Sequence, residues 1–235
     1  MKLSTLLLIW LALILVGCMF ASNMLLKKQY DTLTEHTDKE YPDYKTVLEQ
    51  PFKHVKISGG LHFGLIYFES SSQYSLKIGR DFDAIAASQV DYSIEKDTLI
   101  IEFKASEDYH RSAYYYDKSF LIAAPIPMSF DVITSRLYIR DYNQKAVFIN
   151  LSDRSIVDFS VDKQHENLDT MKITSEFSTF SIKSAAQIQH FEANLDRGGQ
   201  LDLLQADIKT LKINADDNAF LSLTMKQWQS VKKKE

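Results

Sequence analysis

The chain has 235 residues, a net charge of −4, and 45% hydrophobic and 25% charged residues, which is the balance of a folded globular protein. It contains only 7 glycines and 4 prolines, which excludes a collagen-like or largely disordered chain. Beyond residue 28, 31 acidic residues outnumber 24 basic ones, so we expect no nucleic-acid partner, because such binding depends on neutralising phosphates.

The first 28 residues are dominated by an apolar run. Leu3 to Leu26 contains no charged residue, and Lys2 and Lys27 flank it. As a helix the run would be about 36 Å long, enough to cross a hydrocarbon core of about 30 Å. One interpretation of residues 1–28 is therefore an uncleaved signal anchor that spans a membrane.

A second interpretation is a lipoprotein signal peptide. The run Leu15-Val16-Gly17-Cys18 resembles the bacterial lipobox, in which the cysteine becomes the lipidated first residue. Cys18 is then the candidate lipid-attachment residue; otherwise it is one more small apolar residue of a membrane helix. Both interpretations predict a membrane partner and place the rest of the chain in the cell envelope, outside the cytoplasm.

Residues 29–50 are polar and predict a juxtamembrane spacer, with a short helix over residues 44–50. From Pro51 the apolar residues alternate with polar ones, which is the period of a half-buried strand. Strands are predicted around residues 55–57, 61–67, 74–78, 90–94 and 99–103, with Lys96-Asp97 as a hairpin turn.

Further along, the apolar positions repeat every 20 residues. Two sets follow this step: Phe148, Leu168, Ile188 and Ile208, and then Leu151, Met171, Phe191 and Leu211. Each copy closes with a second apolar pair: Phe159/Val161, Phe180/Ile182, Leu201/Leu203 and Leu221/Leu223. A constant step of short strands is typical of stacked coils. The sequence thus predicts an all-β, right-handed β-solenoid or β-helix-like domain over 51–224, with an antiparallel sandwich ranked second. Residues 225–235 are predicted to form a cap and tail.

The β region resembles a known family. Pro51 to Gly60 is similar to the opening of the bacterial GIN domain, also called the auto-transporter adhesin head domain, and Asp97 to Phe103 resembles its second landmark. The repeats after about residue 130 fit the β-helical body of that family, although they contain few glycines. The resemblance implies a β-helical fold and an adhesin-like role, and it supplies no catalytic residues.

Candidate reactive groups are few. The six histidines show no metal-ligand spacing and Cys18 is the only cysteine, so we expect no metal and no cofactor. Grouped carboxylates at Asp196, Asp202, Asp216 and Asp217 would suit a carbohydrate-active enzyme, but Asp is also a preferred turn residue. Tyr109 and Tyr114 to Tyr116 would suit sugar or protein contact, or packing within the fold.

Together these features favour a membrane-tethered, exported, non-enzymatic protein that makes adhesive contact with an envelope protein or glycan. Two alternatives remain at this stage. One is a carbohydrate-active enzyme built on a β-helix, and the other is a structural envelope element that stacks on itself.

Overall fold

The computed structural model describes residues 23, 24, 27, 44–59, 65–79, 89–104, 120–125, 129–161 and 167–232. The chain divides into two compact units, residues 1–43 and 44–235, and the account below concerns the second. Most of the apolar run, Cys18, Tyr109 and the tyrosines at 114–116 lie outside the described residues. Within the described ranges, no helix has both the length and the apolar character needed to cross a membrane.

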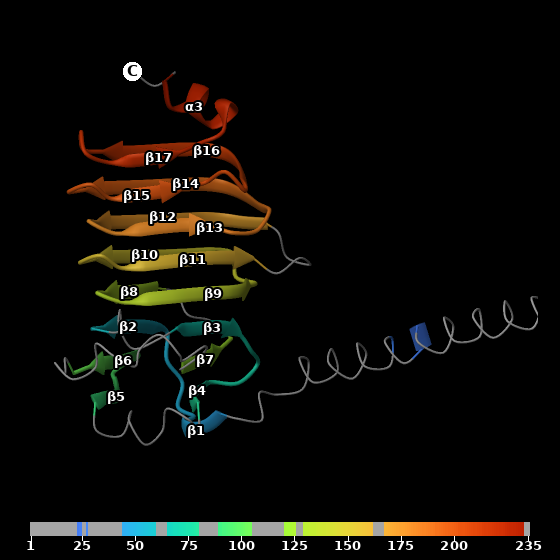
Figure 1. Ribbon diagram of the computed structural model, residues 1–235, viewed down its shortest axis with the longest axis vertical. Coiled ribbons are helices and arrows are strands. Elements are labelled where there is room, and N and C mark those ends of the chain that lie inside the picture. The colour runs from blue at the N-terminus through green and yellow to red at the C-terminus, as the bar shows by residue number, and fades with distance from the viewer. Residues whose placement is uncertain are drawn as a thin grey trace, which may run out of the picture. The chain divides into compact units, whose positions relative to one another are not determined.

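The second unit is mostly β and consists of two mixed sheets (Figure 1). The nine-stranded sheet has the order β1 (Tyr44–Leu48), β4 (Ser75–Gly79), β7 (Phe120–Ala124), β3 (Ile66–Ser70), β9 (Arg136–Tyr142), β11 (Ile156–Val161), β13 (Thr179–Ile182), β15 (Gln200–Asp202) and β17 (Phe220–Ser222). The eight-stranded sheet has the order β16 (Ala206–Ala215), β14 (Ala186–Asp196), β12 (Asn167–Glu176), β10 (Ala146–Ser152), β8 (Ser129–Ile133), β2 (His54–Ser58), β6 (Thr98–Phe103) and β5 (Val90–Glu95). One helix, α3 (Met225–Lys232), follows the last strand.

The start of this unit differs from the sequence-based prediction, whereas the predicted hairpin at Lys96-Asp97 is confirmed. The predicted helix over 44–50 is wrong, because Tyr44–Leu48 forms β1 and pairs antiparallel with β4. The β structure therefore begins before Pro51. Lys96 and Asp97 do form the predicted hairpin turn, since β5 and β6 on either side of them pair antiparallel.

From β8 onward the chain alternates between the two sheets. Each strand from β10 to β17 pairs in parallel with the strand two before it, so successive strand pairs lie one above another, as Figure 1 shows. The predicted 20-residue step holds where Leu168 pairs with Ile188 and Ile188 with Ile208. It also holds where Met171 pairs with Phe191 and Phe191 with Leu211.

The first predicted copy of the repeat is out of register. Val147, and not Leu151, pairs with Met171, and Phe148 pairs with Lys172 and points outward with 41% of its surface exposed. The cause is the longer connection between β11 and β12, which lengthens the step there to 24 residues. The four extra residues are an even number and do not change the face on which a strand residue lies. Phe148 points outward because it alternates with Val147 and Ile149, whose side chains are buried.

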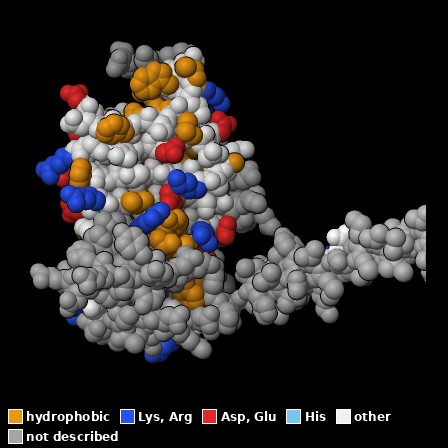
Figure 2. All heavy atoms as spheres, viewed as in Figure 1, with side chains coloured by type: hydrophobic (Ala, Val, Ile, Leu, Met, Phe, Trp, Pro, Cys, Tyr) orange, Lys and Arg blue, Asp and Glu red, His pale blue; other side chains and the backbone are white. Residues whose placement is uncertain are grey.

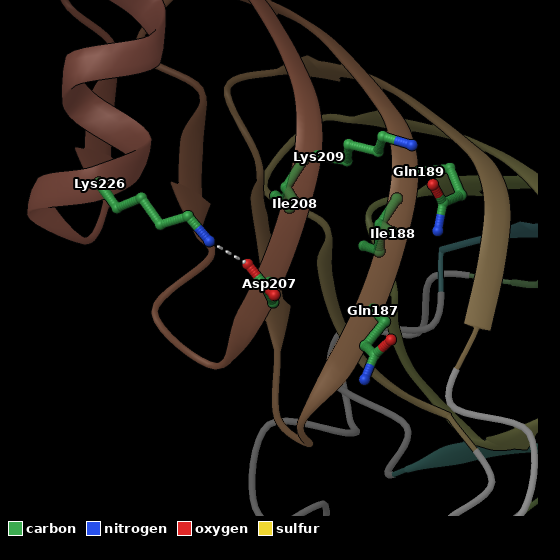
Figure 3. Close-up of a pocket in the computed structure, with 7 residues that line it drawn as sticks. All are labelled: Gln187, Ile188, Gln189, Asp207, Ile208, Lys209 and Lys226. Carbon is green, nitrogen blue, oxygen red and sulfur yellow. Dashed lines mark hydrogen bonds and ion pairs between the residues drawn. The ribbon is translucent and has the colours of Figure 1, made fainter.

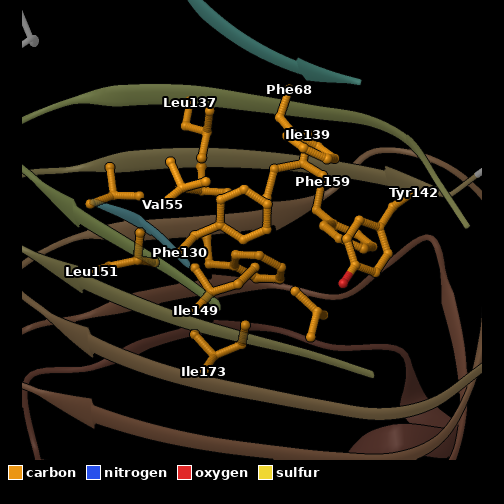
Figure 4. Packing of buried hydrophobic residues seen from close by; sticks show 14 of the residues in the cluster. Val55, Phe68, Phe130, Leu137, Ile139, Tyr142, Ile149, Leu151, Phe159 and Ile173 are labelled. Carbon is orange, nitrogen blue, oxygen red and sulfur yellow. The ribbon is translucent and has the colours of Figure 1, made fainter. Parts of the chain in front are cut away.

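The core lies between the two sheets. Figure 4 shows side chains of both sheets interdigitating, among them Phe130 and Ile149 from one sheet and Phe68 and Phe159 from the other. The rings of Phe68 and Phe130 meet edge to face with their centroids 5.2 Å apart. Tyr142, the largest fully buried side chain, donates its hydroxyl to the carbonyl of Ala146 at 2.8 Å. Every polar atom in this layer thus needs a partner within the protein.

Serines line the corner where the chain passes from the eight-stranded to the nine-stranded sheet. The backbone N–H of Ser135 donates to Ser155 Oγ at 3.3 Å, and that of Ser155 donates to Ser178 Oγ at 3.1 Å. Arg154 and Phe177, just before two of these serines, have φ values of 66° and 50°. The corners therefore turn through left-handed residues, and buried hydroxyls satisfy the amides that follow.

The helix α3 is fastened over the beginning of β16. Thr224 and Gln227 form a capping box: Gln227 N donates to Thr224 Oγ1 at 3.3 Å, and Thr224 N donates to Gln227 Oε1 at 2.7 Å. Gln227 Nε2 also donates to the carbonyls of Leu203 (3.1 Å) and Ala206 (2.7 Å). The predicted C-terminal segment thus packs against the last strands through a glutamine that is 4% exposed.

Candidate functional site

The outer face of the eight-stranded sheet carries polar side chains in straight columns. We call the part formed by β12, β14 and β16 the ladder face. One column contains Thr174, Asn194 and Asn214, and its neighbour contains Lys172, Glu192 and Lys212. Because the strands pair in parallel without an offset here, each side chain lies about 4.8 Å from its equivalent on the next strand.

Members of these columns hydrogen-bond to one another. Asn214 Nδ2 donates to Asn194 Oδ1 at 2.8 Å. Glu192 binds Lys212 Nζ at 2.7 Å through Oε1 and Lys172 Nζ at 3.3 Å through Oε2. Hydrogen bonds from both lysines, that from Lys212 first, lower the pKa of Glu192 below its ordinary value of 4.5. The carboxylate of Glu192 is thus held between two lysine ammonium groups.

A hollow of about 360 Å³ lies where the ladder face meets α3 (Figure 3). Its polar lining comes from Gln187 and Gln189 on β14, Asp207 and Lys209 on β16, and Lys226 on α3. Lys226 Nζ and an Asp207 carboxylate oxygen are 2.9 Å apart and close one side. In the described part of the chain, the side chains of Gln187, Gln189 and Lys209 make no hydrogen bond or ion pair. The hollow thus offers donors and acceptors to a ligand.

The apolar pattern of the sequence does not indicate this site, because the columns consist of polar residues. The same 20-residue step that aligns the buried residues also aligns Lys172 with Glu192 and Lys212. A search for polar residues at that step would have found the ladder face.

The predicted carboxylate group does not assemble as an acid–base site. Asp202 Oδ1 accepts a hydrogen bond from Leu204 N at 3.2 Å, and Asp216 Oδ1 accepts one from Asn218 N at 3.1 Å. Both carboxylates thus serve turns, as Asp commonly does. Asp196 and Asp217 lie exposed at the corners before β15 and β17. Among the described residues, no group of three His, Cys, Asp or Glu side chains is placed to hold a metal ion.

A serine and a histidine meet on the outer face of the same sheet. His54 Nδ1 on β2 lies 2.7 Å from Ser129 Oγ on β8. A hydrolytic triad would also need a carboxylate to orient the imidazole. Asp131, the next outward residue on β8, accepts a hydrogen bond from Asn150 Nδ2 at 2.7 Å. The pair is therefore a cross-strand contact and gives no indication of catalysis.

The outer face of the nine-stranded sheet carries a cluster of cations and tyrosines. Tyr67 and Tyr138 stack with their ring centroids 5.2 Å apart, and Arg140 and Arg136 lie over the two rings. Burial is the main cause that raises the pKa of Tyr138 above 10.0. Asp158 lies between Arg136 (3.9 Å) and Lys183 (3.4 Å). The charged groups of the cluster pair with one another, while Arg136 Nε is buried without a hydrogen-bond partner among the described residues.

Charges of both signs are interspersed on the described part of the face that Figure 2 shows. On that face neither cations nor anions gather into a large field of one sign. That face therefore has no charged field that would steer a strongly charged polymer to it.

Comparisons with known proteins yield likeness only at the level of solved structures. No family model matches the chain, and no curated protein matches it either. A "putative adhesin" from Parabacteroides merdae has 9% identity and a TM-score of 0.44, over 73% of this chain and 75% of its own. A "putative lipid binding protein" from Parabacteroides distasonis has 12% identity and a TM-score of 0.36, over 73% of this chain and 77% of its own. A "putative adhesin" from Bacteroides fragilis has the same identity and TM-score, over 76% of this chain and 95% of its own. At TM-scores below 0.5 these likenesses support no inference about function, and the GIN-domain resemblance stays a prediction.

Proposed function

We propose that this chain is a membrane-tethered, exported β-solenoid protein that binds a protein or glycan of the cell envelope through the ladder face. The role is adhesive and requires no catalytic group. The parallel stacking of strand pairs from β8 to β17 supports the solenoid, since each pair covers the apolar face of the next.

The ladder face, with the hollow at its edge, is the observation that carries the proposal. The sheet there is regular, and its outward side chains are hydrogen-bonding groups that include the free amides of Gln187 and Gln189. Ligand sites commonly combine an apolar floor with a few well-placed polar groups. Ile188 and Ile208 provide such a floor beneath the hollow.

Binding by the full chain to arrays of envelope glycans and envelope proteins tests the proposal. Replacing Asn194 by Arg places a bulky cation in the middle of the ladder face, and we expect at least a tenfold loss of affinity for any ligand found. Asn218→Arg is the matched control, because Asn218 is exposed in a turn away from the columns. Equal losses in both variants, or an absence of saturable binding throughout the screen, would contradict the proposal.

The tether needs its own test, because residues 3–22 and Cys18 lie outside the described residues. Intact-mass analysis of the protein from its native membrane distinguishes the two interpretations of the N-terminus. A chain that begins at a lipidated Cys18 supports the lipoprotein, and an unmodified full chain in the membrane fraction supports the signal anchor. Recovery of the protein from the cytoplasm would refute both.

A further inference from the structure

Both ends of the eight-stranded sheet present a strand edge. In the described part of the chain, β5 ends the sheet on one side and β16 ends it on the other, each paired with a single strand. An unpaired edge offers backbone N–H and C=O groups to another strand. The polar contacts between α3 and β16 are made at Ala206 and Asp207, at the start of the strand. The last residues of β16, from Lys212 to Ala215, lie beyond these contacts.

The columns of the outer face connect these two edges in register. One column runs through Glu95, Thr98, His54, Ser129, Phe148, Lys172, Glu192 and Lys212. A second runs through Ser93, Ile100, Lys56, Asp131, Asn150, Thr174, Asn194 and Asn214. An acidic residue thus begins the column that a lysine ends, and hydrogen-bonding side chains stand at both ends of its neighbour.

The inward column between them is incomplete at both edges. It runs through Ile94, Leu99, Val55, Phe130, Ile149, Ile173, Ala193 and Ile213. Its inner members are at most 1% exposed, whereas Ile94 and Ile213 are only partly buried, because each lacks a neighbour on one side. Tyr92, also on β5, is 39% exposed.

We propose that this chain stacks head to tail, with β16 of one copy pairing antiparallel with β5 of the next. Moving one copy along the stack by a single strand spacing places Glu95 of the next copy opposite Lys212. The charge alternation of Lys172, Glu192 and Lys212 then continues with a fourth member. The same move places Ile94 of the next copy on Ile213 and its Ser93 on Asn214, so that one register completes all three columns.

The geometry predicts a weak contact. Pairing of residues 92–95 with 212–215 is about 13 Å long, and it ends there because Asp91 would approach Asp216. So short an edge buries less than the roughly 1,200 Å² of standard interfaces, so we expect association at concentrations on the order of 100 µM. The contact joins two different surfaces, so it generates an open stack with no closed ring.

Sedimentation of the full chain tests the proposal through charge exchange. Lys212→Glu and Glu95→Lys should each lower the association constant about three- to tenfold. The double variant should return it to within about twofold of the wild type. Lys172→Glu is the matched control, because Lys172 binds the same Glu192 but lies two strands from the edge. The apolar segment over residues 3–26 is common to all variants, so its own association does not alter these ratios.

A disulfide provides a second, independent measurement. A Ser93→Cys chain mixed with an Asn214→Cys chain should form a 93–214 link under mild oxidation, because cross-strand Cα atoms lie about 5 Å apart. Peptide mapping distinguishes this link from any made by Cys18. A wild type that stays monomeric at 100 µM, a double variant that fails to recover, or a missing 93–214 link would each overturn the proposal.

Discussion

Replacing Gln227 by Ala removes the side chain that fastens α3 to the last strands. Three hydrogen bonds are lost: those from Nε2 to the carbonyls of Leu203 and Ala206, and the one that Oε1 accepts from Thr224 N. A typical hydrogen bond contributes about 1 kcal/mol net, and a buried carbonyl left without a partner costs about 1–3 kcal/mol. The side chain of Gln227 is 4% exposed, so water has little access to the hydrogen-bonding groups that the substitution leaves without a partner. We therefore expect a loss of about 2–4 kcal/mol in the free energy of docking α3.

Trp228, beside Gln227 on the same helix, reports on this docking. It is one of two tryptophans in the chain, the other being Trp10 in the apolar segment, and it is 42% exposed. Urea titration followed by tryptophan fluorescence should show the Trp228 transition at a lower urea concentration in Gln227→Ala than in the wild type. Native-state hydrogen exchange should show the same loss at the amides of α3.

Two further variants sharpen the assay. Gln229→Ala makes the same chemical change at an exposed position of α3 and should stay within about 0.5 kcal/mol of the wild type. Gln227→Glu keeps an acceptor for Thr224 N but cannot donate to the two carbonyls, so most of the loss should persist. If Gln227→Ala and Gln229→Ala were equally stable, the assignment of Gln227 as the fastening residue would be refuted.

Three other changes test the packing and the charges. Gly59→Ala and Gly198→Ala both strain the backbone, because each glycine has a φ near 80°. A Cβ added at Gly59 would lie 2.5 Å from the Phe103 carbonyl oxygen, whereas a Cβ added at Gly198 would lie no closer than 3.5 Å to any neighbour. Thermal unfolding should therefore show the larger loss of stability in Gly59→Ala. Ser155→Ala removes a buried hydroxyl that accepts from the Ser135 N–H and donates to the Val132 carbonyl, and it should cost about 1–3 kcal/mol in urea unfolding. Ser222→Ala, at an exposed position, should cost less than about 0.5 kcal/mol. Because the folded protein lowers the pKa of Glu192, this residue stabilises the fold at pH values above 4.5, its unfolded pKa, and the contribution is lost as the pH falls through the folded pKa. When unfolding is measured against pH, Glu192→Gln should therefore lose less stability in acid than the wild type. An unchanged dependence of stability on pH would contradict the ion-pair column.

The local pattern of the sequence determined most of the strands and the direction of their side chains. Strand residues alternate between two faces, so the apolar positions of β2, β6 and the strands from β12 onward predict which side chains are buried. The 20-residue step also predicts which of these side chains lie next to one another, because parallel strands that pair at this step bring equivalent residues together. Leu168 and Ile188 follow this rule, as do Met171 and Phe191.

Tertiary structure decided what depends on pairing between distant segments. Phe148 pairs with Lys172, and not with Leu168, because the step from β10 to β12 is 24 residues instead of 20. Tyr44–Leu48 became a strand because β4 offers it an edge. Gln227 is buried because the carbonyls of Leu203 and Ala206, at the turn before β16, accept hydrogen bonds from its side chain. Glu192 binds two lysines because parallel pairing brings residues 20 positions apart into contact. Periodicity thus determines which face a side chain takes, whereas the lengths of the connections between strands determine what it meets there.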